Sequence, residues 1–142
     1  MKIEVVKDRN CLDSLEILEK EIFRKSFYNR VQLEEMYENS NYKIILAFDN
    51  DKIVGYIIAY DSYDTMEIMK IAVIKERRKE SIGNRLFEKL LEETNLNIML
   101  EVRESNVSAI KFYEQKGMKK IAVRKNYYSD NGENAWIMLL ER

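Results

Sequence analysis

Residues 77–91 read RRKESIGNRLFEKLL, so two arginines, a lysine, a serine and a glycine directly precede a strongly amphipathic run. A helix beginning there would offer backbone N–H groups that have no partner inside the helix, at the positive end of its dipole. Gly83 would let a ligand approach the backbone closely, and Arg77 and Arg78 could pair with phosphate oxygens. The segment is a candidate anion site, although a solvated basic turn would use the same residue types. It matches neither the Walker pattern GxxxxGK[ST] nor the GxGxxG turn.

Two absences in the composition restrict the chemistry that the chain can perform. It contains no histidine, and Cys11 is its only cysteine. Ser-His-Asp triads, Cys-His pairs, histidine-ligated metals, cysteine-rich zinc sites and intrachain disulfides are therefore excluded, and we expect no metal. If the protein transfers protons, its base is a carboxylate, a tyrosine, a lysine or a water relay.

Two side chains stand out as candidates for proton transfer. Glu101 ends the apolar stretch IMLEV, where partial burial can raise the pKa of a carboxyl group toward neutrality. Alternatively, it is a surface glutamate that pairs with Arg103 or with a lysine. Tyr113 shares a helical face with Ala109 and Ile110, which predicts a core ring whose hydroxyl can still face a cleft.

Hydrophobic periodicity and turn residues predict the elements that must position these groups. Strands are expected at residues 2–6, 42–48, 53–60, 67–74, 98–102, 118–128 and 134–141, with turns at 49–51 and 129–132. Helices are expected after a cap at Asn10, at residues 31–38, at residues 81–93, and from a cap at Ser105 or Asn106 to Gly117. This order predicts an α/β (α+β) protein with a mixed, largely antiparallel sheet covered by helices.

Length and charge narrow the class of protein. A chain of 142 residues without a linker or repeat predicts a single domain, residues 1–142. No apolar stretch reaches the roughly 18–20 residues of a membrane span, and MKIEVVKDRN is too polar for a signal peptide, so we expect a cytoplasmic protein without a membrane partner. The 24 basic and 25 acidic residues balance to a net charge of −1, which disfavours nucleic-acid binding.

In their order along the chain, four segments resemble the GNAT superfamily of N-acetyltransferases, and within it the RimI type, the ribosomal-protein-alanine N-acetyltransferases. They are EIMKIAV, RRKESIGNRLFEKLL, LEVRESNVSAIKFYEQKGM and RKNYYSDNGENAWIM, which together cover most of residues 67–138. The resemblance implies the GNAT fold, with about seven strands, about four helices and splayed central strands. It also implies an acetyl-CoA-dependent enzyme.

The family motif for the pyrophosphate of coenzyme A, R/Q-x-x-G-x-G/A, falls on residues 78–83 of this chain. Arg78 and Gly83 match it, whereas Ser81 replaces the first glycine and Lys79 replaces a common glycine. Main-chain groups at residues 71–73 would pair with the pantetheine arm, as the resemblance implies. The cofactor-binding residues implied in this way are Ile71, Ala72, Val73, Arg78, Lys79, Ser81, Ile82, Gly83, Asn84, Asn106 and Tyr113; Asn106 could equally be only a helix cap.

The same resemblance assigns roles to the proton-transfer candidates and to two tyrosines. Glu101 matches the family base, and Tyr113 matches the acid that protonates the departing coenzyme A sulfur. Tyr127 and Tyr128 match the segment that borders the peptide channel, although strand-end aromatics packed on the sheet would give the same pattern. RimI proteins commonly carry Pro-Trp-Ser around the first helix pair, where this chain has Arg24-Lys25-Ser26-Phe27.

The resulting hypothesis is direct acetyl transfer from acetyl-CoA to a primary amine, such as the N-terminal α-amine of a ribosomal protein. A small-molecule amine or antibiotic is the alternative acceptor. A non-catalytic acyl-CoA-binding module is the alternative class of protein. The chain is expected to work as a monomer or a homodimer.

Overall fold

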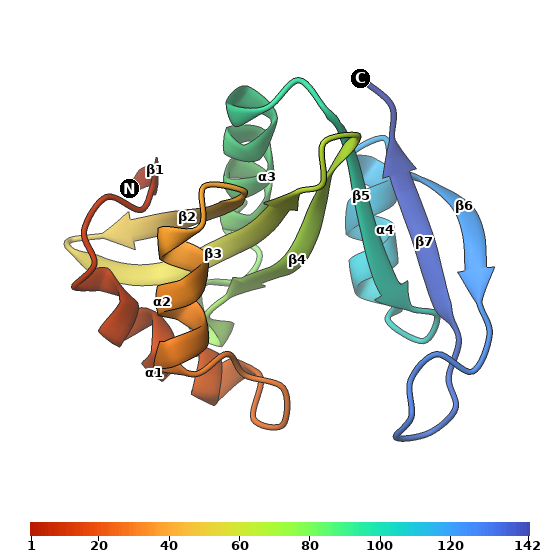
Figure 1. Ribbon diagram of the computed structural model, residues 1–142, viewed down its shortest axis with the longest axis horizontal. Helices are drawn as coiled ribbons and strands as arrows, with labels where there is room; N and C mark the ends of the chain where they lie inside the picture. Colours follow the sequence, from red (N-terminus) through yellow and green to blue (C-terminus); the bar gives the residue numbers. More distant parts are fainter. The chain divides into compact units, whose positions relative to one another are not determined.

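The computed structural model describes residues 1–142, which form a seven-stranded sheet in the order β1-β2-β3-β4-β5-β7-β6 (Figure 1). The strands are β1 (Lys2–Val5), β2 (Tyr42–Asp49), β3 (Lys52–Asp61), β4 (Thr65–Val73), β5 (Asn97–Arg103), β6 (Lys119–Arg124) and β7 (Ala135–Leu140). The helices are α1 (Cys11–Ile22), α2 (Arg30–Glu38), α3 (Ile82–Glu93) and α4 (Val107–Gln115), with a short 3-10 helix η1 (Lys75–Arg77). The predicted mixed sheet with four α-helices is confirmed.

The chain forms two compact units, and β4 contributes to both. The first unit contains Met1–Asp61 and Met69–Thr94, and the second contains Ser62–Ile68 and Asn95–Arg142. In the first unit β2 pairs antiparallel with β1 and with β3. In the second unit β5 pairs parallel with the first four residues of β4 and antiparallel with β7, which also pairs with β6. The prediction that β5 is a central strand is therefore confirmed.

The first unit covers both faces of its strands with helices (Figure 1). Leu12 and Leu15 of α1 and Leu33 of α2 are fully buried against the face of the sheet that carries Tyr56. The adjacent residue, Gly55, faces α3: a Cβ atom there would lie 3.3 Å from side-chain atoms of Ile82 and Leu86, and 3.0 Å from the Ala72 carbonyl oxygen. Glycine at position 55 therefore lets β4 and α3 pack closely on β3.

A buried ionic network joins α1 of the first unit to β3 and β4. The Glu19 side chain is fully buried, accepts hydrogen bonds from the Tyr56 hydroxyl and the Tyr28 N–H, and lies 2.6 Å from Lys70 Nζ. Burial, followed by the Glu19 carboxylate, raises the pKa of Tyr56. Lys70 Nζ also donates to the Ser26 carbonyl at 2.6 Å and lies 3.9 Å from the centre of the Tyr28 ring. These contacts hold the segment between α1 and α2 against β4.

In the second unit, α4 is bounded as the sequence predicts. The Asn106 side chain accepts a hydrogen bond from Ala109 N–H at 3.3 Å, so it is the helix cap. Gly117 adopts a left-handed φ of 91°, and Met118 N–H donates to the Tyr113 carbonyl at 3.0 Å, which closes a Schellman motif. Ile110 and Tyr113 of α4 are buried.

Two details of the predicted elements are wrong. Asn10 precedes α1, but its helical backbone (φ −63°, ψ −23°) prevents the side-chain cap that an extended residue would make. Asn29 instead forms a capping box with Gln32 at the start of α2. The strand predicted to reach residue 128 ends at Arg124, because residues 125–134 form their own loop, where Asn126 takes a left-handed φ of 51°. None of the helices has the length and apolarity needed to cross a membrane.

Candidate functional site

The predicted anion loop joins β4 to α3 in the first unit, and its backbone is strained. Lys79 and Ser81 have left-handed φ values of 72° and 65°, a conformation that disfavours non-glycine residues. These are the two positions at which this chain lacks a glycine that the family resemblance leads one to expect, whereas Gly83 is retained. The first α-helical hydrogen bond runs from Arg85 N–H to the Ser81 carbonyl, so the N–H groups of residues 82–84 precede the helical ladder. The backbone therefore keeps the glycine-like conformation without the glycines.

The two arginines of this loop are already engaged within the protein. Arg77 lies 2.5 Å from Asp49 and 2.8 Å from Glu80, and these bonds raise the pKa of Arg77. The prediction that Arg77 is available to phosphate oxygens is therefore not supported by its contacts. Arg78 donates from Nε to the Val73 carbonyl at 3.1 Å, so only its remaining N–H groups can reach another partner.

Main-chain groups of β4 alternate between the β3 side and the opposite side. The Ile74 N–H donates to the Val54 carbonyl at 2.9 Å, and the Ala72 carbonyl approaches Gly55, so both residues direct their main-chain groups at β3. It follows that Ile71 and Val73 direct theirs away from β3. Of the three residues predicted to pair with pantetheine, these two have the orientation required, whereas Ala72 does not.

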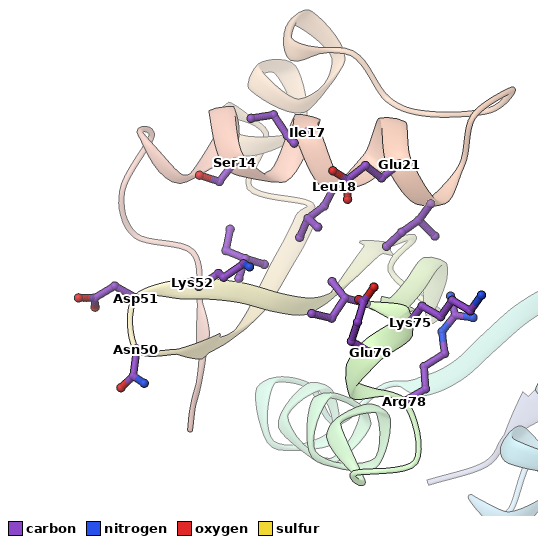
Figure 2. A pocket seen from close by; sticks show the side chains of 13 residues that line it. Ser14, Ile17, Leu18, Glu21, Asn50, Asp51, Lys52, Lys75, Glu76 and Arg78 are labelled. Carbon is purple, nitrogen blue, oxygen red and sulfur yellow. The ribbon is translucent and has the colours of Figure 1, made fainter.

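A pocket of about 750 Å³ lies between α1, the β2–β3 turn and η1 (Figure 2). Arg78 lines it, but no other predicted site residue does. Its apolar wall is Ile17, Leu18, Ile22, Ile53 and Ile74, and its charged groups are Lys52, Lys75, Arg78, Glu21, Asp51 and Glu76. Because three cations face three anions, the pocket has no charge preference for a phosphate group.

The second unit brings the Glu67 carboxylate, the Arg124 guanidinium and the Tyr127 phenol to the region of Glu101. Glu67 pairs with Met99 in the β4–β5 register, which puts its side chain on the same sheet face as Glu101. The Glu101 carboxylate lies 3.6 Å from Arg124, whose guanidinium lies 5.4 Å from the centre of the Tyr127 ring. The Glu101 carboxylate raises the pKa of Tyr127. The alternative prediction that Glu101 pairs with Arg103 is wrong, and its side chain is 19% exposed.

Glu67 is a further candidate site residue, which the sequence alone did not single out. Burial raises the pKa of Glu67, the negative charge of Glu101 raises it further, and Arg124 partly lowers it. The signal in the sequence was a glutamate inside an otherwise apolar strand, TMEIMKIAV, but its register with Glu101 depends on the β4–β5 pairing. This pair of carboxylates can hold or move a proton on one face of the sheet.

Tyr113 is a core residue whose hydroxyl stays available. The residue is 7% exposed, and burial raises its pKa to about 12. Its ring packs edge-on against Phe112, and its hydroxyl makes no hydrogen bond within the protein. Every fully buried side-chain nitrogen or oxygen has a partner, so the Tyr113 oxygen must reach the surface of the unit. The prediction of a core ring is therefore confirmed, and the role of the hydroxyl as an acid stays a prediction.

Tyr127 and Tyr128 lie in the 125–134 loop rather than at the end of a strand. Their rings meet edge-on with centroids 5.1 Å apart, and the Arg103 guanidinium stacks 3.9 Å from the centre of the Tyr128 ring. The Arg124 guanidinium lies 5.4 Å from the centre of the Tyr127 ring. No group of three or more acidic or cysteine side chains is arranged to hold a metal ion.

Comparison with known proteins agrees with this arrangement of elements. The [ribosomal protein bS18]-alanine N-acetyltransferase of Escherichia coli K12 is 34% identical over 97 residues, 64% of this chain and 66% of that protein. The crystal structure of the ribosomal-protein-S18-alanine N-acetyltransferase from E. coli has a TM-score of 0.85 and 26% identity, covering 98% of this chain and 92% of that one. An aminoglycoside 6′-acetyltransferase type Ii has a TM-score of 0.84 and 28% identity, covering 99% and 97% of the two chains.

The family model of GNAT acetyltransferases matches residues 12–118, which include parts of both compact units, the anion loop, Glu101 and Tyr113. The match covers most of the chain. The chain therefore belongs to the GNAT family of acetyltransferases and is an N-acetyltransferase of the RimI kind.

Proposed function

We propose that the protein transfers the acetyl group of acetyl-CoA directly to the N-terminal α-amine of a protein, such as a ribosomal protein. The observation that carries this proposal is the carboxylate pair Glu67 and Glu101 on one sheet face, with Arg124 3.6 Å from Glu101. An amine must lose a proton before it attacks a thioester, and a paired, partly buried carboxylate is suited to accept it.

The anion loop would hold the pyrophosphate of acetyl-CoA. The N–H groups of Ile82, Gly83 and Asn84 precede the helical ladder, and the left-handed backbone at Lys79 and Ser81 supports an amide nest. The Nε of Arg78 is hydrogen-bonded to Val73, so its other guanidinium N–H groups would add charge-assisted hydrogen bonds to the pyrophosphate.

Main-chain groups that face away from β3 would bind the pantetheine arm. Ile71 and Val73 have this orientation, and an extended arm can pair with such an edge as another strand would. Asn106 would contribute only indirectly, because its side-chain oxygen is occupied as the α4 cap.

Glu101 would accept the proton of the attacking amine, directly or through a water. Its contact with Arg124 is long at 3.6 Å, and Glu67 supplies a second carboxylate that attracts a cationic amine. Tyr113 would donate its proton to the departing sulfur. Its raised pKa of about 12 keeps the hydroxyl protonated at neutral pH, and the hydroxyl has no competing acceptor in the protein.

The relatives of the chain indicate two classes of acceptor. The names and identities of the bS18 acetyltransferases support a protein N-terminus, which Tyr127 and Tyr128 would border. The 28% identity to an aminoglycoside acetyltransferase supports a small-molecule amine as the second candidate. The segment Arg24–Phe27 lacks the Pro-Trp-Ser common in RimI proteins and so favours neither acceptor.

The test is incubation with acetyl-CoA and a panel of peptides and small amines, followed by mass spectrometry of every product. We expect a peptide α-amine to gain one acetyl group, and acetylation of small amines alone would replace the first acceptor by the second. Coenzyme A binding without any transfer would leave only an acyl-CoA-binding module. Glu101→Gln should lower turnover while cofactor affinity persists, whereas exposed Glu88→Gln on α3 should change neither.

A further inference from the structure

Arg103 lies where the 125–134 loop returns to the sheet. It is the last residue of β5, on the same face as Glu101 two residues earlier. In the strand register Arg103 pairs with Ala135, and Ala135 pairs with Arg124. The loop that begins after Arg124 therefore returns to the sheet beside Arg103, one strand away from the point where it left.

The Arg103 guanidinium contacts the loop at four side chains, one of them Asn131, whose Oδ1 accepts a hydrogen bond at 3.5 Å. It lies 3.2 and 3.0 Å from the two oxygens of Asp130 and 3.2 Å from Glu133, and it stacks 3.9 Å from the Tyr128 ring centre. These hydrogen bonds raise the pKa of Arg103 and lower that of Asp130. A single exposed ion pair contributes little to stability. One planar guanidinium that contacts two carboxylates and an aromatic ring, however, restricts the orientation of the loop side chains.

Glu133 provides a second attachment between the loop and the end of β5. Its other oxygen accepts the Ser105 N–H at 2.7 Å, and its hydrogen bonds lower the pKa of Glu133 to about 2. Inside the loop, Tyr128 N–H donates to the Glu133 carbonyl at 3.1 Å. Contacts to both the ring and the backbone of Tyr128 therefore hold this residue in place, and Tyr127 directly precedes it.

We propose that Arg103 is a positioning residue that holds the 125–134 loop so that the Tyr127 side chain stays beside Arg124, which pairs with the Glu101 carboxylate. The importance of that contact for acceptor binding rests on the proposed function of Glu101. Arg103 touches neither carboxylate of the Glu67–Glu101 pair and acts through the loop alone. Lysine is a poor replacement, because an ammonium cannot bridge two oxygens of Asp130 and stack on Tyr128 at once.

The test uses Arg103→Met and Arg103→Lys in the full-length protein. NMR of ¹³C-labelled tyrosines, assigned with Tyr127→Phe, reports the pKa of Tyr127. In Arg103→Met this pKa should fall toward the ordinary value of 10.0, because the loop no longer keeps Tyr127 near the Glu101 carboxylate, which raises it. Loss of a nearby positive charge alone would move it upward, so the direction separates loop release from a charge effect. Arg103→Lys should resemble Arg103→Met.

Kinetics provide the second readout. Arg103→Met should raise the KM of the acceptor about tenfold, the size of coupling between contacting residues, while the KM of acetyl-CoA stays unchanged. Combining Arg103→Met with Asp130→Asn should add little to the single variant. Arg9→Met is the matched control, since Arg9 pairs with Glu34 and Glu38 and lies 5.3 Å from the Tyr37 ring centre, yet is outside the site.

A folded Arg103→Met variant with an unchanged or higher Tyr127 pKa and an unchanged acceptor KM would overturn the proposal. If the wild-type protein acetylates no amine, the proposed function fails, while the tyrosine titration still decides the role of Arg103.

Discussion

Lys70 places its ammonium 2.6 Å from a carboxylate oxygen of Glu19, a residue with no exposed surface. Burial is the main reason that the pKa of Lys70 is lowered, even though its bond to Glu19 acts in the opposite direction. Lys70 immediately precedes Ile71, whose main-chain groups face away from β3. The pair therefore fixes β4 at the point where the proposed cofactor edge begins.

Removing one partner of this pair should cost much more stability than removing both. Lys70→Met leaves Glu19 buried without its cation, and we expect the free energy of unfolding to fall by about 3–5 kcal/mol. Glu19→Met combined with Lys70→Met should recover a large part of that loss, most of all when Tyr56→Phe removes the unpaired hydroxyl. Urea denaturation measures these differences.

The control for the pair is Lys20→Met, because Lys20 also has a carboxylate and a ring nearby but is exposed. It lies 3.9 Å from Glu16 and 5.6 Å from the Phe27 ring centre, with a side chain 54% exposed. Its loss should change stability by less than about 0.5 kcal/mol. A Lys70→Met variant as stable as Lys20→Met would show that the buried pair does not stabilise β4.

Glu67 should make stability fall as the pH rises. Its pKa in the fold lies above its ordinary value of 4.5, so the folded protein keeps a proton that the unfolded chain has already released. Stability therefore decreases as the pH rises from the unfolded to the folded pKa, and ionised Glu67 is destabilising at neutral pH. Glu67→Gln should raise the melting temperature at neutral pH and have little effect below both pKa values. A pH-independent difference would contradict this assignment.

Glycine should relieve the strain in the anion loop. Lys79→Gly and Ser81→Gly remove the penalty of a left-handed φ, and each should raise the free energy of unfolding by about 1 kcal/mol. Lys75→Gly is the control: Lys75 is not among the positive-φ residues, so glycine there should lower stability. Calorimetry with coenzyme A should find its affinity preserved in Ser81→Gly, because every backbone N–H remains. Loss of binding in that variant would remove the nest from the proposed site.

Much of the fold follows from local rules in the sequence. Apolar periodicity, Asn106 as a cap and Gly117 as a left-handed terminator predict α4 correctly, since each acts within a few residues. The error at Tyr127 and Tyr128 has a local cause as well: Asn126 at a φ of 51° and the hydrogen bond from Asn126 N–H to the Asn134 side chain end the strand early. Asparagine tolerates that conformation, but its identity alone does not require it.

The candidate site was less predictable, because its contacts depend on register and on partners distant in sequence. Glu101 and Tyr113 were identified, whereas Glu67 becomes a partner of Glu101 only through the parallel pairing of β4 and β5. Arg77 looked available for phosphate because its partner Asp49 lies 28 residues away. A single sequence reports charges, but it does not report which of them neutralise one another in the fold.

Tyr113→Phe tests the proposed acid with the smallest possible change. The ring is retained, and the hydroxyl makes no hydrogen bond within the protein, so the buried packing of α4 should survive. Circular dichroism and thermal melting should therefore match the wild type. Tyr37→Phe is the control, since its hydroxyl donates to the Lys7 carbonyl at 3.2 Å, remote in the chain from every proposed catalytic group.

If Tyr113 protonates the departing sulfur, the variant should lose about 10²–10⁴-fold in the rate of acetyl transfer. Single-turnover measurements with enzyme in excess isolate this chemical step from product release, and the affinity for acetyl-CoA should change little. Because the chain contains no histidine, no internal imidazole can replace the lost acid. Partial rescue of the Tyr113→Phe rate by added imidazole would therefore support a missing acid. A folded Tyr113→Phe protein with a wild-type single-turnover rate would make Tyr113 a packing residue and leave the protonation of the sulfur to water.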